Sequence, residues 1–161
     1  MEDRYFLEKM EIFRMPLAEG NNTVVPLPIY ATEEAACMDF YSANIEDVII
    51  PAGEQAMVGL GIKVAIAKGY ELTLRPRSGL ANKHMVSITN SPGTIDSDYR
   101  GEVKVIIINL GKKPFVVEPF MRVCQGKIER ALQYSYKEVY SDEELGHTPR
   151  GEGGFNSTGT K

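Results

Sequence analysis

The chain has few of the residues that build metal centres and disulfide frameworks. Among its 161 residues are two cysteines, Cys37 and Cys124, and two histidines, His84 and His147. The cysteines form no CxxC pair and the histidines lie far apart in the sequence. This pattern predicts no zinc site and favours a reducing compartment.

Long apolar runs and an excess of positive charge are also missing. The N-terminal stretch MEDRYFLEKM has no apolar segment of the secretory type, and no run approaches the length of a membrane span. The net charge is −4, which argues against a general nucleic-acid binder. We therefore expect a cytoplasmic protein that binds neither nucleic acid nor membranes.

Convincing helical spacing is absent too, whereas short-period apolar patterns are common. GYELTLRPR (69–77) alternates with period two, and GEVKVIIINL (101–110) is a β-branched run. Further strands are expected in QAMVGLGIKVAIA (55–67), KKPFVVEPF (112–120) and RVCQGKIERA (122–131). One short helical turn is expected at SDEEL, capped by Ser141. Many short strands with frequent turns predict a sandwich or barrel.

The compositional break near the C-terminus sets the expected organisation. RGEGGFNSTGTK (150–161) holds four glycines, an isolated Phe155 and several hydroxyl side chains. We expect a single β domain over residues 1–147, in which residues 1–25 are an extension of unknown role. Residues 148–161 are expected to form a glycine-rich arm.

Two stretches carry residues suited to a nucleotide. RPRSGLA (75–81) has an Arg, a Ser and a Gly where a strand ends, and these groups suit a phosphate; a turn with a solvated Arg explains them about equally well. In TNSPGTIDSDYRGEV (89–103), a Pro-Gly turn leaves bare backbone that a flat base can bond. Asp96 and Asp98 lie two residues apart, so they point the same way in an extended chain. An Asp beside a phosphate can orient or deprotonate a water, although a DxD pair alone is more often a surface turn.

Two further stretches place a polar side chain within an apolar context. Asp39, in EEAACMDFYSA (33–43), is expected to be paired, to reach a cation or its waters, or to cap a loop. Gln125, in RVCQGKIE (122–129), either faces a cleft or is simply exposed. Cys37 and Cys124 are interpreted as packing residues rather than nucleophiles.

Taken together and in this order, the five stretches resemble the five motifs of the trimeric dUTPase family, the deoxyuridine triphosphate nucleotidohydrolases. The resemblance runs from about Pro26 to Thr160. It implies an all-β protomer with a distorted jelly-roll or barrel fold. It also implies a homotrimer in which each active site is built from all three chains. The glycine-rich C-terminal arm would be a flexible lid, ordered by substrate. The implied reaction is Mg²⁺-assisted hydrolysis of dUTP to dUMP and pyrophosphate, which keeps uracil out of DNA and supplies dUMP for thymidylate synthesis.

The resemblance also implies a role for matching residues. Asp96 would activate the water that attacks the α-phosphate, and Tyr99 would pack against the sugar and exclude a ribose. Asn90 and the backbone around Gly93 would read uracil, and Phe155 would stack on it. Asp39 would hold Mg²⁺ through water. The residues expected to contact the phosphates are Arg77, Ser78, Gly79, Gln125, Arg150, Gly153, Gly154, Ser157 and Thr158.

The chain departs from the family's usual motifs at four positions. Cys37 stands where Gly is usual, Phe40 where Leu is frequent, and Cys124 where Ala is usual. Asn156 replaces a usual Gly, and Asn tolerates positive φ better than most residues. Because Asp39 is retained, we expect activity to survive.

Three other readings compete with dUTP hydrolysis. A dCTP deaminase would share the fold, but that family lacks the combination of a sugar-stacking Tyr and a complete glycine-rich lid. The second alternative is a dUTPase-like scaffold that binds a regulatory protein. The complete motif set argues against an inactive scaffold, but it does not exclude an additional protein partner. A structural jelly roll of the capsid or lectin type would explain the strands but not the five motifs.

Overall fold

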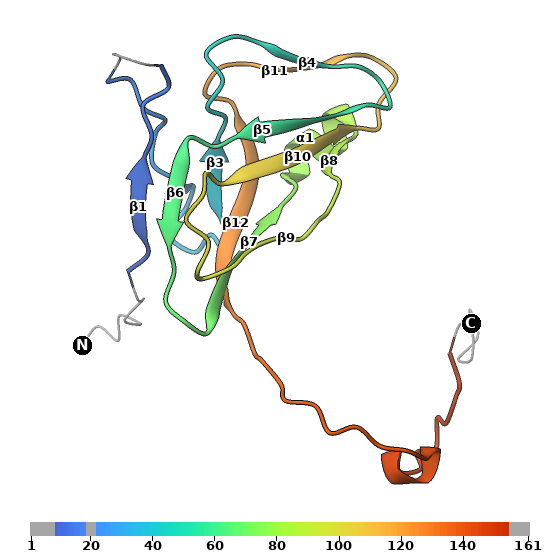
Figure 1. Ribbon diagram of the computed structural model, residues 1–161. Helices are drawn as coiled ribbons and strands as arrows, with labels where there is room; N and C mark the ends of the chain where they lie inside the picture. Colours follow the sequence, from blue (N-terminus) through green and yellow to red (C-terminus); the bar gives the residue numbers. More distant parts are fainter. Residues whose placement is uncertain (1–8, 19–21, 155–161) are drawn as a thin grey trace.

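The computed structural model describes residues 9–18 and 22–154, and these form an antiparallel β-barrel followed by a long arm (Figure 1). The all-β expectation is confirmed. The largest sheet has five strands in the order β2-β3-β12-β7-β9. Its strands are β2 (Ile29–Tyr30), β3 (Met38–Tyr41), β12 (Arg122–Arg130), β7 (Tyr70–Arg75) and β9 (Gly93–Ile95).

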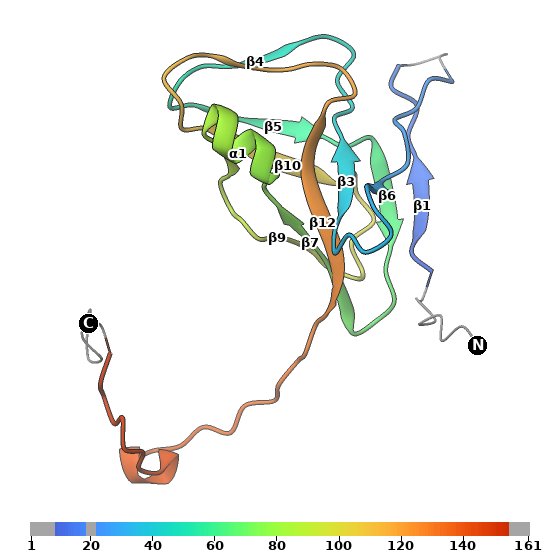
Figure 2. The same ribbon diagram turned by 180° about the vertical axis from the view of Figure 1, so that it is seen from behind.

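A three-stranded sheet lies across the barrel from the five-stranded sheet. Figure 1 shows β5 and β10 in front of β12, and Figure 2 shows the reverse order from behind. The sheet order is β5-β10-β8. Its strands are β5 (Gln55–Gly59), β10 (Lys104–Asn109) and β8 (Val86–Ile88).

Two strand pairs complete the described β structure. β1 (Glu11–Arg14) pairs with β6 (Ile62–Ala65), and β4 (Val48–Ile50) pairs with β11 (Phe115–Val117). The stretch before Pro26 therefore contributes a strand to its own chain. Part of the N-terminal extension, whose role was unknown, therefore belongs to the β structure of the domain.

The core lies between the sheets and follows the alternation of the strands. On β7, Leu72 and Leu74 are completely buried or nearly so, and Val105 and Ile107 on β10 face them from the other layer. Phe40 on β3 is buried in the same cluster. The alternation read from residues 69–77 gives the correct inner face for β7, although Thr73 between the two leucines is buried as well.

The segment 55–67 differs from the single glycine-containing strand that the sequence suggests. It forms two strands, β5 and β6, which pair with different partners, β10 and β1. Gly61, with φ of +60°, lies between them, and a left-handed residue at this point turns the chain from one sheet to the next.

Two short helical segments occur in the described residues. α1 (Ser78–His84) follows β7 directly, in a stretch where the sequence predicts a turn. The turn at SDEEL is confirmed as a 3₁₀ helix, η1 (Asp142–Leu145), with Ser141 at its N-cap position; no side-chain cap hydrogen bond forms. No helix in the described part of the chain has the length and apolar character of a membrane span.

Candidate active site

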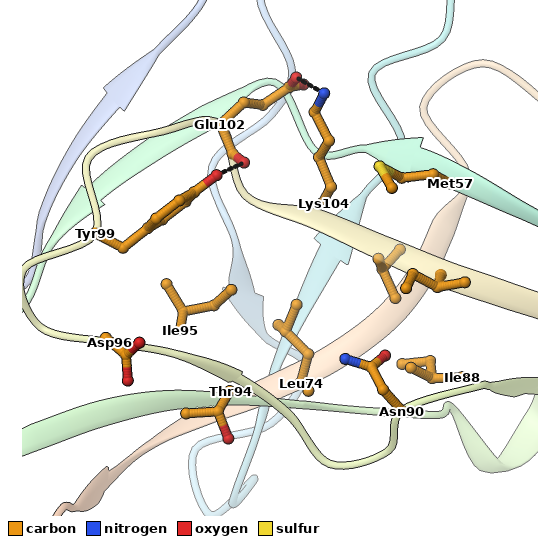
Figure 3. Close-up of a pocket in the computed structure, with 13 residues that line it drawn as sticks. Met57, Leu74, Ile88, Asn90, Thr94, Ile95, Asp96, Tyr99, Glu102 and Lys104 are labelled. Atoms are coloured by element: carbon orange, nitrogen blue, oxygen red, sulfur yellow. Dashed lines mark hydrogen bonds and ion pairs between the residues drawn. The ribbon is translucent and has the colours of Figure 1, made fainter.

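A cavity of about 310 Å³ opens between β9, the loop after it, and strands β5 and β10 (Figure 3). Four residues that the sequence singled out line it together: Asn90, Gly93, Asp96 and Tyr99. The remaining lining residues were not assigned roles from the sequence: they are Met57, Leu74, Ile88, Thr94, Ile95, Glu102, Lys104, Val105 and Ile106. The cavity therefore has an apolar middle with polar groups on two sides, Asn90 and Asp96 on one and Glu102 on the other, which suits a flat heterocycle (Figure 3).

The turn that leads into β9 presents both an amide side chain and bare backbone to the cavity. The Ser91–Pro92 peptide bond is cis, and Gly93 begins β9, where it pairs with Leu74 of β7. A Cβ added to Gly93 would lie 3.5 Å from Asn90 Nδ2 and 3.7 Å from Leu74 Cβ. The backbone would tolerate such a Cβ, but it would take up space beside the Asn90 amide.

Asp96 and Tyr99 lie on the loop that joins β9 to β10. The Tyr99 N–H donates to the Asp96 carbonyl across 3.1 Å, which closes a tight turn. Asp96 is exposed, so its carboxylate is accessible at the cavity edge. Asp98 is also exposed but does not line the cavity. The structure thus separates the two acids of the DxD pair, because Asp98 lies in this turn and the chain is not extended between them as the sequence suggested.

The Tyr99 ring forms one wall of the cavity and is tied to its own loop. Its Oη donates to the backbone carbonyl of Glu102 across 3.0 Å, and Glu102 in turn pairs with Lys104 (Figure 3). Neither Glu102 nor Lys104 was singled out from the sequence. The available signal was the position of Glu102 inside the motif that carries Tyr99.

A second cluster of polar residues lies on the outer face of the five-stranded sheet. Asp39 on β3 pairs in register with Gln125 on β12, and Gln125 pairs with Arg75 on β7. Asp39 is buried and accepts from both nitrogens of the Arg77 fork, at 2.9 and 3.2 Å. Arg122 Nη1 adds a contact of 3.1 Å to Asp39 Oδ2. One carboxylate facing two guanidinium groups leaves a positive site, which suits an anion.

The corner between β7 and α1 is held by the same cluster. Gln125 Nε2 donates to the Pro76 carbonyl across 2.8 Å, so its amide supports the corner rather than facing free solvent. Arg77 occupies the N-cap position of α1 in an extended conformation, and Ser78 and Gly79 form the first turn. The first N–H groups of a helix have no partner within it, so this corner presents donors.

Asp39 is also the residue expected to hold Mg²⁺ through water. It accepts three hydrogen bonds from Arg77 and Arg122, and a carboxylate offers about four lone-pair sites, so one remains for a metal-bound water. Within the described residues, no group of three or more His, Cys, Asp or Glu forms a metal cage. Because the two guanidinium groups make the cluster positive, a hydrated Mg²⁺ would fit beside Asp39 only together with the negative charge of bound phosphates.

Cys124 lies behind this cluster and is completely buried. Burial raises the pKa of its thiol to about 12; the charge of Asp39 adds to the increase, and Arg77 opposes it. The thiol therefore stays protonated near neutral pH, which agrees with the interpretation of Cys124 as a packing residue. Cys37 is half-buried, and both thiols are free.

The arm that carries the last motif leaves the barrel after Arg130. Figures 1 and 2 show residues 131–154 running away from the sheets. Arg150 is exposed, and its Nε donates to the Gly153 carbonyl across 2.6 Å next to a local turn; Gly154 follows and is also exposed. Phe155, Ser157, Thr158 and the departure at Asn156 lie outside the described residues. None of Arg150, Gly153 and Gly154 lines the cavity.

Comparisons with known proteins agree on one family. A family model described as dUTPase matches residues 23–159. A deoxyuridine 5′-triphosphate nucleotidohydrolase of Rickettsia canadensis is 47% identical over 150 residues, which cover 93% of this chain and 99% of that protein. The protein of the same name from Chlamydia pneumoniae is 50% identical over 134 residues, covering 83% and 90%.

Solved structures show the same fold at lower identity. A variant of the Staphylococcus bacteriophage 80alpha dUTPase with dUpNHpp superposes with a TM-score of 0.75 at 22% identity, covering 95% of this chain and 99% of that one. A variant of the dUTPase from phage phi11 of S. aureus, reported with a structural Mg(II) ion, gives a TM-score of 0.70 at 20% identity, covering 84% and 99%.

Proposed function

The chain belongs to the dUTPase family, and we propose that it hydrolyses dUTP to dUMP and pyrophosphate by attack of an Asp96-activated water on the α-phosphate. The observation that carries this proposal is the single cavity lined by Asn90, Gly93, Asp96 and Tyr99. These four come from one motif and supply a base reader, a general base and a sugar wall at one place.

The base is proposed to be read by the Asn90 amide and the backbone around Gly93. Cytosine presents the reverse donor and acceptor pattern to such a reader, so binding it would leave buried groups unpaired. Thymine differs by one methyl, and attraction alone discriminates a methyl by only about 1–3 kcal/mol, so its exclusion has to be steric. The strand pairing between Gly93 and Leu74, which fixes the backbone in this wall of the cavity, supports this reading.

Asp96 is proposed to orient and deprotonate the attacking water. A general base must lie within hydrogen-bond reach of the water it activates, and the exposed carboxylate at the cavity edge is accessible to one. In-line attack on the α-phosphate then requires the triphosphate to extend from the sugar past Asp96. Tyr99 is proposed to pack on the deoxyribose, where a 2′-hydroxyl would have no room.

The phosphates are proposed to bind the second cluster. Arg77 with the first-turn donors of Ser78 and Gly79 suits a phosphate, and Gln125 supports the same corner. When Mg²⁺ is bound, it would neutralise charge on the leaving pyrophosphate, with Asp39 holding it through water. The arm is proposed to complete the site: Phe155 would stack on uracil, while Arg150, Gly153, Gly154, Ser157 and Thr158 would contact the phosphates.

A homotrimer with shared sites is proposed because one chain does not bring these parts together. The base cavity is lined by none of Arg77, Gln125 and Asp39. The arm after Arg130 leads away from the barrel of its own chain (Figure 1). If a neighbouring copy supplies the phosphate cluster and a third supplies the arm, each site becomes complete. The proposal also includes the division into one domain (residues 1–147) and its lid (residues 148–161). A cytoplasmic location and the supply of dUMP belong to it as well.

The test is pyrophosphate release from dUTP with Mg²⁺, with dTTP, dCTP and UTP in parallel. Cleavage of dUTP alone is expected. Equal cleavage of all four would contradict the assignments of Asn90, Gly93 and Tyr99. Deamination of dCTP, followed as ammonia release, would instead assign the chain to the deaminase reaction.

A further inference from the structure

The carboxylate of Glu102 lies where the loop that carries Tyr99 meets the barrel. We propose that Glu102 is a positioning residue that fixes the Tyr99 ring as a wall of the cavity and so sets the selectivity for deoxyribose over ribose. This inference rests on the proposed function, in which the Tyr99 ring excludes a ribose, because it explains what holds that ring in place.

The first observation is that Tyr99 depends on residue 102 for its orientation. The ring lies on a loop and is 42% exposed, so packing alone holds it weakly. Its Oη donates to the Glu102 carbonyl across 3.0 Å, and Figure 3 shows the ring spanning from its own backbone to that residue. Such a bond fixes the ring only if residue 102 is itself fixed.

The second observation is that the Glu102 side chain anchors that point to the barrel. Its Oε1 accepts from the N–H of Gly61 across 3.2 Å, at the break between β5 and β6. Its Oε2 pairs with Lys104 Nζ across 3.5 Å. The next residue is held on both sides, because the Leu60 N–H donates to the Val103 carbonyl and the Val103 N–H donates to the Ile62 carbonyl, each across 2.9 Å. The charged acceptor thus joins the loop to a rigid part of the fold.

The third observation is that two glycines make room for this arrangement. A Cβ on Gly59 would collide with the Glu102 carboxylate, and a Cβ on Gly101 would collide with the Tyr99 ring, lying 2.6 Å from its Cζ. Neither glycine has a positive φ, so backbone conformation does not demand them. Their lack of side chains is instead explained by the space that Glu102 and Tyr99 occupy.

The experiment measures kcat/KM for dUTP and for UTP in the wild type, Glu102→Ala and Glu102→Gln. In Glu102→Ala the anchor is lost, and the ratio of the two values is expected to fall by about tenfold or more, since hydrogen bonds to charged groups are worth that much. Glu102→Gln keeps an oxygen acceptor for the Gly61 N–H and is expected to retain most of the selectivity. Glu118→Ala, which removes an exposed carboxylate elsewhere, is the matched control and is expected to match the wild type.

A second variant, Gly59→Ala, disturbs the contact between Glu102 and Gly61 without changing Glu102 itself. It covers the case in which Glu102→Ala fails to fold. Gly59→Ala should push the carboxylate away from Gly61 and lower the selectivity as Glu102→Ala does. If the wild type prefers dUTP to UTP and a folded Glu102→Ala or Gly59→Ala protein keeps the same preference, the inference about Glu102 is wrong while the proposed function stands. A wild type that does not distinguish dUTP from UTP would overturn the proposed function as well, so the two failures are distinguishable.

Discussion

The two acids of the DxD pair have the same chemistry but different positions. Asp96 lines the cavity beside Asn90 and Tyr99, whereas Asp98 is exposed outside it. A pair of identical side chains two residues apart therefore offers a built-in comparison between the proposed general base and a surface carboxylate on the same loop.

Asp96→Asn is expected to lower kcat for dUTP by about 100- to 10 000-fold, because positioned general bases contribute that much. The amide cannot accept the proton of the water. Asp98→Asn is the matched control and should keep a rate close to that of the wild type. Steady-state pyrophosphate release checks both. Equal losses in the two variants would remove Asp96 from its proposed role.

Gly93 tests whether the bare backbone of the turn is needed for the base rather than for the fold. Gly93→Ala should fold normally, because its new Cβ meets atoms only at 3.5 Å and beyond. The methyl would occupy space beside the Asn90 amide, so kcat/KM for dUTP is expected to fall by about 10- to 200-fold. Calorimetry of unfolding and kinetics on the same sample separate the two effects. An unstable protein, or one with unchanged kinetics, would contradict this view of the turn.

Cys124 predicts a pH dependence of stability at the alkaline end. Burial raises the pKa of its thiol in the folded chain to about 12, from about 9. Between these values the unfolded chain loses the thiol proton while the folded chain keeps it, so the thiol's contribution is full below pH 9 and declines as pH rises. The free energy of unfolding of the wild type, relative to Cys124→Ala, is expected to fall by about 1.4 kcal/mol per pH unit in this window. Urea titrations of both proteins from pH 8 to alkaline pH check it.

Residue identities in a motif were readable from the sequence, but their supporting contacts were not. Asp96, Asn90 and Tyr99 lie within one short stretch, so their convergence needs only a local turn. Asp39 and Arg77 meet because β3 and β7 both flank β12, and that strand order follows from long-range pairing. The second partner of Asp39, Arg122, and the Glu102 anchor on Gly61 were missed for the same reason.

Among the elements, the connection between β10 and β11, which lie in different sheets, is held by one buried amide. Asn109, at the end of β10, donates to the carbonyls of Ile50 on β4 and Lys113, at 2.9 and 2.8 Å. Its Oδ1 accepts from the Gly111 N–H across 2.9 Å. A single fully buried side chain thus joins the three-stranded sheet to the β4–β11 pair.

Asn109→Ala is expected to lower the free energy of unfolding by about 3 kcal/mol, because three hydrogen bonds are lost and the carbonyl of the buried Ile50 stays unpaired. Asn44→Ala is the matched control. The half-buried Asn44 amide donates to the carbonyls of Glu46 and Val117. Its loss should cost less, about 1 kcal/mol, because Glu46 is exposed to water and the substitution also removes the buried, unpaired Asn44 Oδ1. Denaturant unfolding of both variants measures the two free energies of unfolding. Equal losses of stability would contradict the role of Asn109 in joining the two sheets.

The elements themselves were predictable where the alternation of apolar residues decided the outcome. β7 follows from a period-two pattern and β10 from a β-branched run, and β12 was expected as a further short strand. α1 was missed because its seven residues bury no side chain and so carry no apolar stripe. The division of residues 55–67 between β5 and β6 depends on which partner each half meets, β10 or β1, and a local pattern contains no such information.

For the whole molecule, the proposal of a homotrimer with shared sites rests on the fact that the motifs lie in separate regions of one chain. The cavity is lined by no residue of the Asp39–Arg77 cluster or of the arm, and the arm runs away from the barrel (Figure 2). Closed rings of identical subunits bring different surfaces of neighbours together, so three incomplete chains can make three complete sites. A chain that worked alone would have to fold its own arm back across the barrel.

Mixing two inactive variants distinguishes these cases. Asp96→Asn lacks the proposed base, and a chain truncated before Arg150 lacks the lid motif; each alone should be inactive. If a site takes its base from one subunit and its arm from another, trimers refolded from an equal mixture should regain about a quarter of the wild-type sites, since each of the two parts is intact with a chance of one half. Activity is followed as pyrophosphate release, and the unmixed variants refolded separately are the controls. If both parts belonged to the same chain, every site in the mixture would lack one of them, and no activity would return.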